Sequence, residues 1–307
     1  MKISNQLLFD RGAQQMSAVQ TKLAQSQAQL AQGKQIINPS DAPDKAAAIQ
    51  RLNSVLSRQT SYQTSLDNVK TRLDGEETAL SSASDLIIRI KEISVQAAND
   101  TLGPENRQAL ATEMQALRDQ LLSLANTQDS NGNYLFAGSK VGKPAFAMDG
   151  TGYPAYQGDQ TRMQVSIGDQ RSIAVNRTGT DAFVSVARKD AQGNVKGVGF
   201  FQSIDELIAG IKNSDQKAMQ QGIGETDKLL QGLSMAQAAV GSDQATLEHQ
   251  TSVIDATTLN LKATLSSLQD LDYASAVTTM NQQMLSLEAA QSSFAKISQL
   301  NLFNFIK

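Results

Sequence analysis

The chain has 307 residues, 27 basic and 30 acidic side chains, a formal net charge of -3, one histidine and no cysteine. The slightly negative charge argues against a binder of nucleic acid or membrane surfaces, because both functions need concentrated positive charge. Without cysteine the chain has no disulfides and no thiol chemistry. No stretch approaches the roughly 18 apolar residues of a membrane span, and the first residues do not read as a secretory signal peptide.

The N-terminal segment, residues 3–35, is predicted to be a helix with an apolar seam. Met16, Leu23, Leu30 and Ile37 recur every seventh residue, which is the period of helices that pack along a narrow seam. Charged residues are sparse up to residue 40: Lys2, Asp10, Arg11, Lys22 and Lys34. Because charge normally keeps the outer face of a helix in water, this scarcity indicates that both faces make contacts.

A turn ends this segment, and a long helix is predicted after it. The turn motif consists of Asn38, Pro39, Ser40, Asp41 and Pro43. Asp41 is a candidate N-cap, and proline is tolerated in a first helical turn. Two heptad rows that start at Leu52 and Val55 then predict a coiled-coil helix over residues 44–99, whose apolar seam is interrupted at Gly75 and Glu76.

A third helix is predicted to start at Pro104, since proline is favoured at the first helical position. Its apolar residues are spaced by three and four: Leu110, Met114, Leu117, Leu121 and Leu124. Three amphipathic helices in succession indicate a helical bundle.

The middle of the chain, residues 130–205, has a different character and is predicted to be a small β-rich insert. Eleven of the 20 glycines lie between Gly132 and Gly199, among short runs that favour strands: YLFAG, RMQVSIG and RSIAVN. Residues 168–170 separate two of these runs and indicate a hairpin turn. Eight of the 14 aromatic residues also lie in this region, which predicts a compact aromatic core there.

Helix is predicted to resume at Ser203, a candidate cap with Glu206 three residues later. A seven-residue row follows: Val240, Leu247, Ile254, Leu261 and Leu268. The sequence LQDLDYAS then predicts a break. The last arm repeats the apolar seam and carries few charges: Tyr273, Val277, Met280, Met284, Leu287 and Phe294. The chain ends in an apolar cluster of Leu302, Phe303, Phe305 and Ile306.

These patterns predict a mainly α fold with a β-rich insert, built as a long antiparallel coiled-coil bundle from both ends of the chain. We expect three parts: terminal assembly arms (residues 1–40 and 272–307), a helical rod (41–129 and 206–271) and the outer insert (130–205). The free energy gained by burying the seam residues of one arm cannot offset the entropy that its backbone loses on ordering. The arms are therefore predicted to order only when neighbouring subunits cover them.

No catalytic, metal or cofactor site is predicted. His249 is the single histidine and falls in a predicted helix, where a solvated role is expected. The segment from Asp129 has a faint calcium-loop pattern but lacks the glycine at position six and the terminal glutamate. Glu76 and Glu77 are expected to be solvated helix residues.

Three segments resemble the bacterial flagellin family: residues 30–52, which contain the NPSDAP turn, residues 90–127, and the C-terminal arm from residue 271. Together with the intervening helices they cover roughly two thirds of the chain. Within this family the turn, the short insert and the NLFNFIK ending are similar to the hook-associated branch, which forms the hook-filament junction, more than to filament flagellins. The seam residues of the two arms would then form the assembly interface.

The resemblance implies an extracellular, non-enzymatic structural role, with export through the flagellar type III apparatus and no cleaved signal. Implied partners are further copies of the chain, another hook-associated protein, flagellin, and a cytoplasmic export chaperone at the C-terminal arm. Two alternatives stay open: a short filament-forming flagellin, and a type III secreted coiled-coil translocator or effector. An enzyme hidden in the insert ranks last, because the insert has no histidine.

Overall fold

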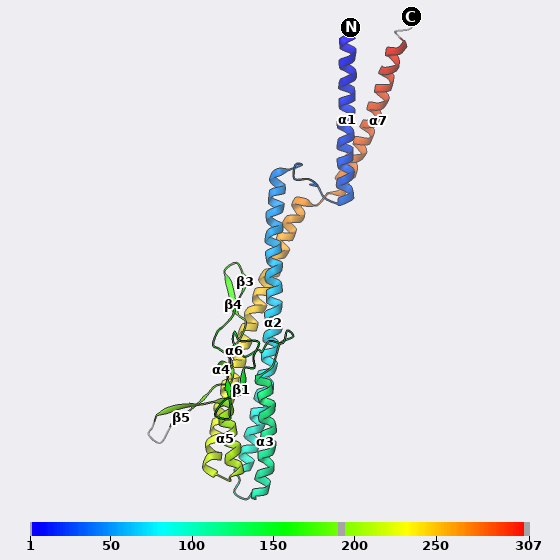
Figure 1. The fold of residues 1–307 in the computed structure, drawn as a ribbon. Coiled ribbons are helices and arrows are strands. Elements are labelled where there is room, and N and C mark those ends of the chain that lie inside the picture. Colours follow the sequence, from blue (N-terminus) through cyan, green and yellow to red (C-terminus); the bar gives the residue numbers. More distant parts are fainter. Residues whose placement is uncertain (1, 190–193, 304–307) are drawn as a thin grey trace. The chain divides into compact units, whose positions relative to one another are not determined.

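A computed structural model describes the backbone of residues 2–189 and 194–303; side chains are described except at residues 1–6, 8, 190–193 and 297–307. The seven helices of these residues are α1 (Lys2–Gln32), α2 (Pro43–Ala97), α3 (Pro104–Ala125), α4 (Gly179–Ala182), α5 (Phe200–Lys212), α6 (Gln216–Gln269) and α7 (Tyr273–Phe303) (Figure 1). All strands lie between α3 and α5. The predicted fold class, mainly α with a β-rich insert, is therefore confirmed.

The chain divides into two compact units. Unit 1 comprises residues 1–58 and 255–307, and unit 2 comprises residues 59–254. Both α2 and α6 contribute to each unit, because their residue ranges cross the two boundaries. The finer division into arms, rod and insert stays a prediction.

The heptad rows of α2 and α6 are buried only inside unit 2. In α2 burial starts at Leu66 and continues to Ala97, whereas Leu52 and Val55 of the same rows are half-buried. In α6 the row is buried at Val240, Leu247 and Ile254 and half-buried at the next two positions, Leu261 and Leu268. The same heptad pattern is thus buried in unit 2 and half-buried in unit 1, since a seam residue is buried only where further elements surround the helices.

In unit 2, α3, α5 and the insert cover the apolar faces of α2 and α6. α3 and α5 pack against each other, and the Arg118 guanidinium binds both carboxylate oxygens of Asp205 at 2.8 and 2.7 Å. This pairing brings the two ends of the insert together. Figure 1 shows α3 and α5 beside α2 and α6 in this unit.

As predicted, α2 is one continuous helix through Gly75 and Glu76, which interrupt only the apolar seam. Gly75 lies close to Leu135, and a Cβ there would be 3.5 Å from that side chain. The expectation that Glu76 is solvated is wrong, because its side chain is 0 % exposed. Glu77 is exposed and accepts a hydrogen bond from Gln244 of α6.

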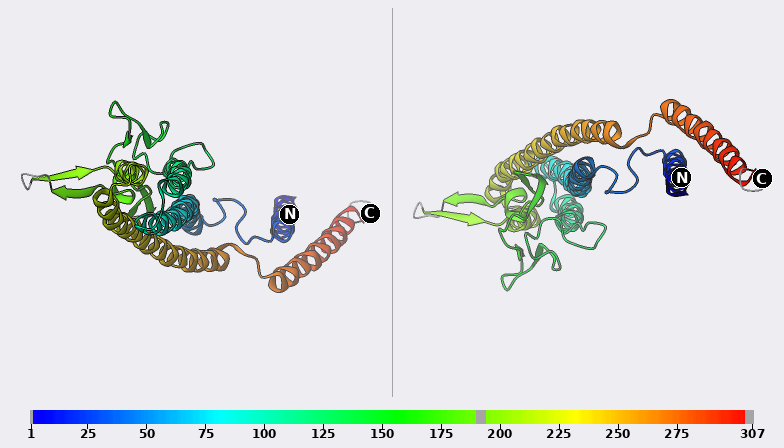
Figure 2. Two further views of the ribbon diagram at one scale, coloured as in Figure 1. Left: turned by 90° about the horizontal axis from the view of Figure 1, so that it is seen from below. Right: turned by 90° about the horizontal axis from the view of Figure 1, so that it is seen from above.

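The insert consists of three antiparallel two-stranded sheets. They pair β1 (Phe146–Met148) with β2 (Pro154–Tyr156), β3 (Gln164–Gly168) with β4 (Arg171–Ala174), and β5 (Val186–Lys189) with β6 (Val195–Val198). The predicted hairpin at residues 168–170 is therefore present. The β5–β6 hairpin projects from the helices of unit 2 (Figure 2).

The run YLFAG is not a strand, contrary to the prediction. Tyr134 and Ala137 make only isolated bridges, with Gln128 and Thr178. Leu135, Phe136 and Ala137 are all buried in succession, so the alternation of a one-sided strand is absent. Gly138, with φ +69, then turns the chain against Asp159.

The predicted aromatic core is present in unit 2. Phe183 contacts Phe136, Phe146 and Phe200, with ring centroids 5.1–5.4 Å apart, and Phe146 also contacts Phe201 at 5.2 Å. Most of these contacts are edge-on, an arrangement that aromatic rings prefer.

The cap predicted for α5 is wrong, because the helix starts earlier, with Gly199 as the N-cap. Ser203 lies inside the helix, where its hydroxyl donates to Glu225 at 2.6 Å, and Glu206 binds Arg188. Phe200 and Phe201, the first two residues of the helix, are both buried in the aromatic core.

Replacement of two glycines of α6 by alanine should change the stability of unit 2 in opposite directions. A Cβ on Gly222 would lie 2.6 Å from Leu207 Cδ1 and 2.9 Å from Leu207 Cβ, whereas a Cβ on Gly224 meets nothing within 4 Å. We expect Gly222→Ala to destabilise unit 2 by about 1–3 kcal/mol through overpacking. Gly224→Ala should stabilise it by about 0.5–1 kcal/mol, because alanine favours the helix. Urea unfolding followed by circular dichroism measures both, and equal effects would contradict the α5–α6 packing.

Candidate assembly interface

In unit 1, α1 and α7 form an antiparallel pair. Near the start of α1 the rings of Phe9 and Phe294 meet with centroids 4.6 Å apart, and Gly12 allows this approach, since a Cβ there would lie 3.3 Å from the Phe294 ring. Closer to the end of α1, the Ser26 hydroxyl donates to Gln283 Oε1 at 2.9 Å. The pairing of the two arm helices therefore lies within one chain.

Main-chain hydrogen bonds close this pair at the end of α1. The N–H of Gln35 donates to the carbonyl of Gln269 at 2.8 Å, and the N–H of Leu271 donates to Gly33 at 3.0 Å. Gly33 has φ +66 and follows the last residue of α1, a position where glycine commonly ends a helix. We call residues 33–35 with 269–271 the base clamp. Sequence reasoning missed it, and Gly33, which directly follows α1, was the available signal.

Unit 1 buries very few of its side chains. Among its described side chains only that of Ser26 belongs to a buried residue, and every buried hydrophobic residue in the described part of the chain lies between Leu66 and Ile254. A layer of two helices covers each helix on one side only. Apolar seams in such a layer remain in contact with water until another surface covers them.

The predicted seam residues fall into two groups. Seven are half-buried: Met16, Leu23, Leu30, Ile37, Met280, Leu287 and Phe294. Three are exposed: Tyr273 at 56 %, Val277 at 42 % and Met284 at 42 %. Leu285 (66 %) and Leu259 (69 %), which sequence reasoning did not select, add to the exposed apolar surface. The apolar cluster predicted at the end of the chain lies outside the described side chains.

The turn motif folds on itself and is exposed at all five positions: Asn38, Pro39, Ser40, Asp41 and Pro43. The N–H of Asp41 donates to the Asn38 carbonyl, and its carboxylate accepts the N–H of Asn38, both at 3.0 Å. The prediction that Asp41 caps α2 is wrong by one residue, because Ala46 donates its N–H to the carbonyl of Ala42 at 2.8 Å.

An open groove of about 990 Å³ lies beside this turn in unit 1. Much of its lining is apolar: Ile36, Ile37, Pro39, Pro43, Ala46, Ala47 and Ile49. The groove and the open face of the arm pair together provide uncovered apolar surface of the kind that marks protein contacts.

The described side chains offer no sign of catalysis or metal binding. Across these residues no group of three or more His, Asp or Glu side chains is placed to hold a metal ion. His249 is an exposed residue of α6. No described helix combines the length and apolar character needed to cross a membrane.

Both ends of the chain match regions of a known family. Residues 3–141 match the bacterial flagellin N-terminal helical region, and residues 223–306 match the bacterial flagellin C-terminal helical region. These two ranges include α1, α2, α3, α7 and most of α6, which are the helices that provide the base clamp and the seams.

Full-length relatives belong to two groups. Flagellar hook-associated protein 3 of Escherichia coli strain K12 is 27 % identical over 320 residues that cover 100 % of both chains. Flagellin of Listeria monocytogenes is 24 % identical over 98 % of this chain and 96 % of its own length. Among solved structures, a putative flagellar hook-associated protein from Vibrio parahaemolyticus is similar in fold, with a TM-score of 0.67, 23 % identity, and coverage of 75 % of this chain and 100 % of its own.

The base clamp gives a testable prediction. Alanine at position 33 would adopt a left-handed conformation, at a cost of roughly 1–2 kcal/mol, and its Cβ would lie 2.7 Å from the Tyr273 hydroxyl oxygen. Gly33→Ala should therefore speed amide exchange of residues 33–35 and 269–273 several-fold in the assembled polymer, where the arms are expected to be ordered. Gly103→Ala is the control, since position 103 has φ -71 and an open Cβ site. Unchanged exchange in Gly33→Ala would contradict the clamp.

Proposed function

Because this chain belongs to the bacterial flagellin family, we propose that it is a structural adaptor of the bacterial flagellum, which joins the hook to the flagellin filament. The end-to-end match to a flagellar hook-associated protein supports the hook-associated branch. The chain acts as a structural component and not as an enzyme. Its contact on the hook side is another hook-associated protein, and its contact on the filament side is flagellin.

The observation that carries this proposal is the absence of buried hydrophobic residues among the described side chains of unit 1. Unit 2 has a complete core, so it can hold its fold in a single subunit. The arm pair has a seam that is half-covered at best, and neighbouring copies supply the missing surface. Ordering of the arms is then coupled to assembly, and the free energy of apolar burial is gained only in the polymer.

The turn motif and the groove beside it belong to the same proposal. The exposed turn of residues 38–43 presents two prolines, Pro39 and Pro43, in a self-bonded loop. Proline and the internal hydrogen bonds reduce the entropy that such a loop loses on contact with a neighbour. We assign this turn and the ten seam residues to the interface between subunits.

The route to this location is part of the proposal. The subunit is exported through the flagellar type III apparatus, and a cytoplasmic chaperone covers the C-terminal arm before export. An uncovered apolar helix such as α7, with Tyr273, Val277, Met284 and Leu285 exposed, is the kind of surface that a chaperone protects from aggregation.

A second candidate function is a short filament-forming flagellin, which the match over 98 % of the chain to a flagellin favours. Adding the purified protein to flagellar filament seeds separates the two. The adaptor should add a single layer and stop, as expected of a junction between two different structures. Unlimited growth by this protein alone, seen by electron microscopy, would assign it to the filament instead.

A charge in the seam should block assembly without unfolding unit 2. Leu287→Asp and Phe294→Asp each place an unpaired carboxylate where apolar contact is expected, which costs several kcal/mol when covered. We expect loss of incorporation and of motility, while thermal unfolding of unit 2 stays unchanged. Ser286→Asp is the control, since position 286 is exposed and polar. Normal incorporation of both seam variants would refute the interface.

A further inference from the structure

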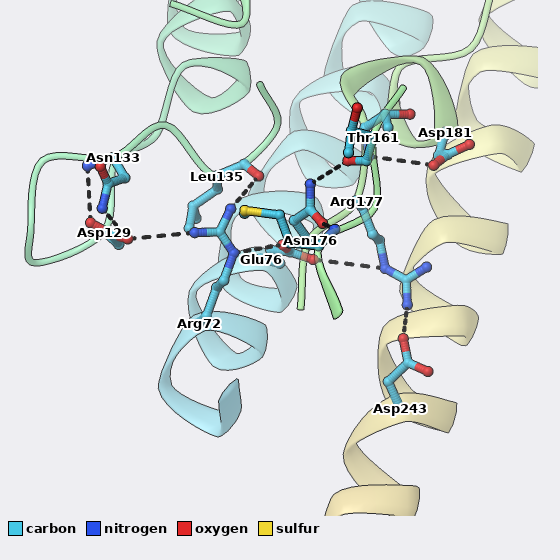
Figure 3. A network of polar contacts seen from close by, with 12 residues as sticks. Arg72, Glu76, Asp129, Asn133, Leu135, Thr161, Asn176, Arg177, Asp181 and Asp243 are labelled. Carbon is cyan, nitrogen blue, oxygen red and sulfur yellow. Dashed lines mark hydrogen bonds and ion pairs between the residues drawn. The ribbon is translucent and has the colours of Figure 1, made fainter. Parts of the chain in front are cut away.

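A cluster of five charged side chains lies where the insert meets the helices of unit 2 (Figure 3). Arg72 and Glu76 come from α2, Asp129 from the loop after α3, Arg177 from the loop between β4 and α4, and Asp243 from α6. Glu76 lies between the two arginines. Its Oε1 is 3.6 Å from Arg72 Nε, and its Oε2 is 3.7 Å from Arg177 Nε.

Each arginine has a second carboxylate partner that is closer than Glu76. Arg72 Nη1 is 3.4 Å from Asp129 Oδ2, and Arg177 Nη2 is 2.5 Å from Asp243 Oδ2. If Glu76 is protonated, the two arginines and two aspartates balance and the cluster is neutral. If Glu76 is ionised, the cluster has a net charge of about -1 in a buried site, which is unfavourable. The number and sign of the charges therefore favour the protonated form.

The side-chain oxygens of Glu76 are also poorly placed for an ionised group. The side chain is 0 % exposed, and neither oxygen has a hydrogen-bond partner that meets normal geometry. A buried carboxylate needs such partners to remain charged. Burial raises the pKa of Glu76 to about 7, and Asp243 acts in the same direction. Arg72, Arg177 and the backbone N–H of Arg177 act against this rise but do not cancel it.

The sequence position of Glu76 is equally unusual. It occupies the seam row that otherwise reads Val55, Tyr62, Val69, Ala83 and Ile90, where an apolar residue would pack without any charge. A titratable carboxyl group therefore stands in a row of apolar residues where the helix meets the insert.

The two arginines connect Glu76 to the loops of the insert. Arg72 Nη2 donates to the Leu135 carbonyl at 2.8 Å, and Asp129 accepts the backbone N–H groups of Asn131 and Asn133. Next to Arg177, Asn176 is buried and bonds Thr161 and Met163. Figure 3 shows Arg72 in contact with both Glu76 and the loop that carries Asp129 and Leu135, and Arg177 next to Asn176 of the other loop. Movement of either arginine toward an ionised Glu76 would therefore disturb these loop contacts.

We propose that Glu76 is a proton-dependent latch, which holds the loops at residues 127–137 and 175–179 against α2 and α6 when neutral and loosens them when ionised. This role is independent of the proposed function in the flagellum. The direction follows from linkage: a group whose pKa is higher in the folded state than in the unfolded state contributes stability that is complete below about pH 4.5. That contribution is lost as the pH rises through about 7.

Glu76→Gln tests the latch, because glutamine has the shape of the protonated side chain and cannot ionise. At pH 5 the variant and the wild type should have similar urea midpoints, and at pH 8.5 the variant should have the higher midpoint. Amide exchange at residues 127–137 and 175–179 should be several-fold faster in the wild type at pH 8.5 after correction for intrinsic rates. Glu77→Gln, on the exposed neighbour, should behave like the wild type. Identical pH profiles for Glu76→Gln and the wild type would overturn the latch.

A second measurement does not depend on whether Glu76→Gln folds. Glutamate carboxyl carbons labelled with ¹³C can be titrated by NMR in the wild-type chain. One glutamate signal that moves between about pH 6 and 8 supports the latch. Titration of every glutamate signal below pH 5.5 overturns it.

Discussion

The structure depends on one constraint: an apolar side chain leaves water only if it is covered from more than one side. α2 and α6 satisfy this constraint in unit 2, where α3, α5 and the insert complete the cover. In unit 1 the same heptad pattern continues, yet Ser26 is the single buried residue among the described side chains. The division of the chain into a self-sufficient core and an uncovered pair of arm helices follows from this difference in cover.

Much of this organisation could be predicted from periodicity and turn chemistry. The seven-residue rows predicted the ends of the long helices to within a few residues, and the glycines and strand-forming runs predicted the place of the insert. The break after α6 lies where LQDLDYAS indicated it. The seam residues of the candidate interface were also accessible from the sequence, because periodicity identifies the apolar face of a helix even where nothing in the same chain covers it.

The errors have a common physical cause, which is tertiary context. Glu76 reads as a solvated helix residue, but the insert closes over it and supplies Arg177. Ser203 was predicted to cap the helix, but the helix starts earlier, at Phe200, which is buried together with Phe201. The base clamp was missed because main-chain hydrogen bonds between residues 33–35 and 269–271 leave no side-chain signature except Gly33.

Three contacts fix the axial position of α7 relative to α1. They are the main-chain bond between Gly33 and Leu271 just outside the two helices, the hydrogen bond from Ser26 to Gln283, and the ring contact of Phe9 with Phe294. Apolar heptads alone would tolerate a slip of one repeat, about 10 Å along the axis. Sliding by that distance would separate all three pairs at once. The exposed apolar side chains of the arm pair therefore occupy the same axial positions in every copy of the chain. A repeating lattice of identical subunits requires this uniformity.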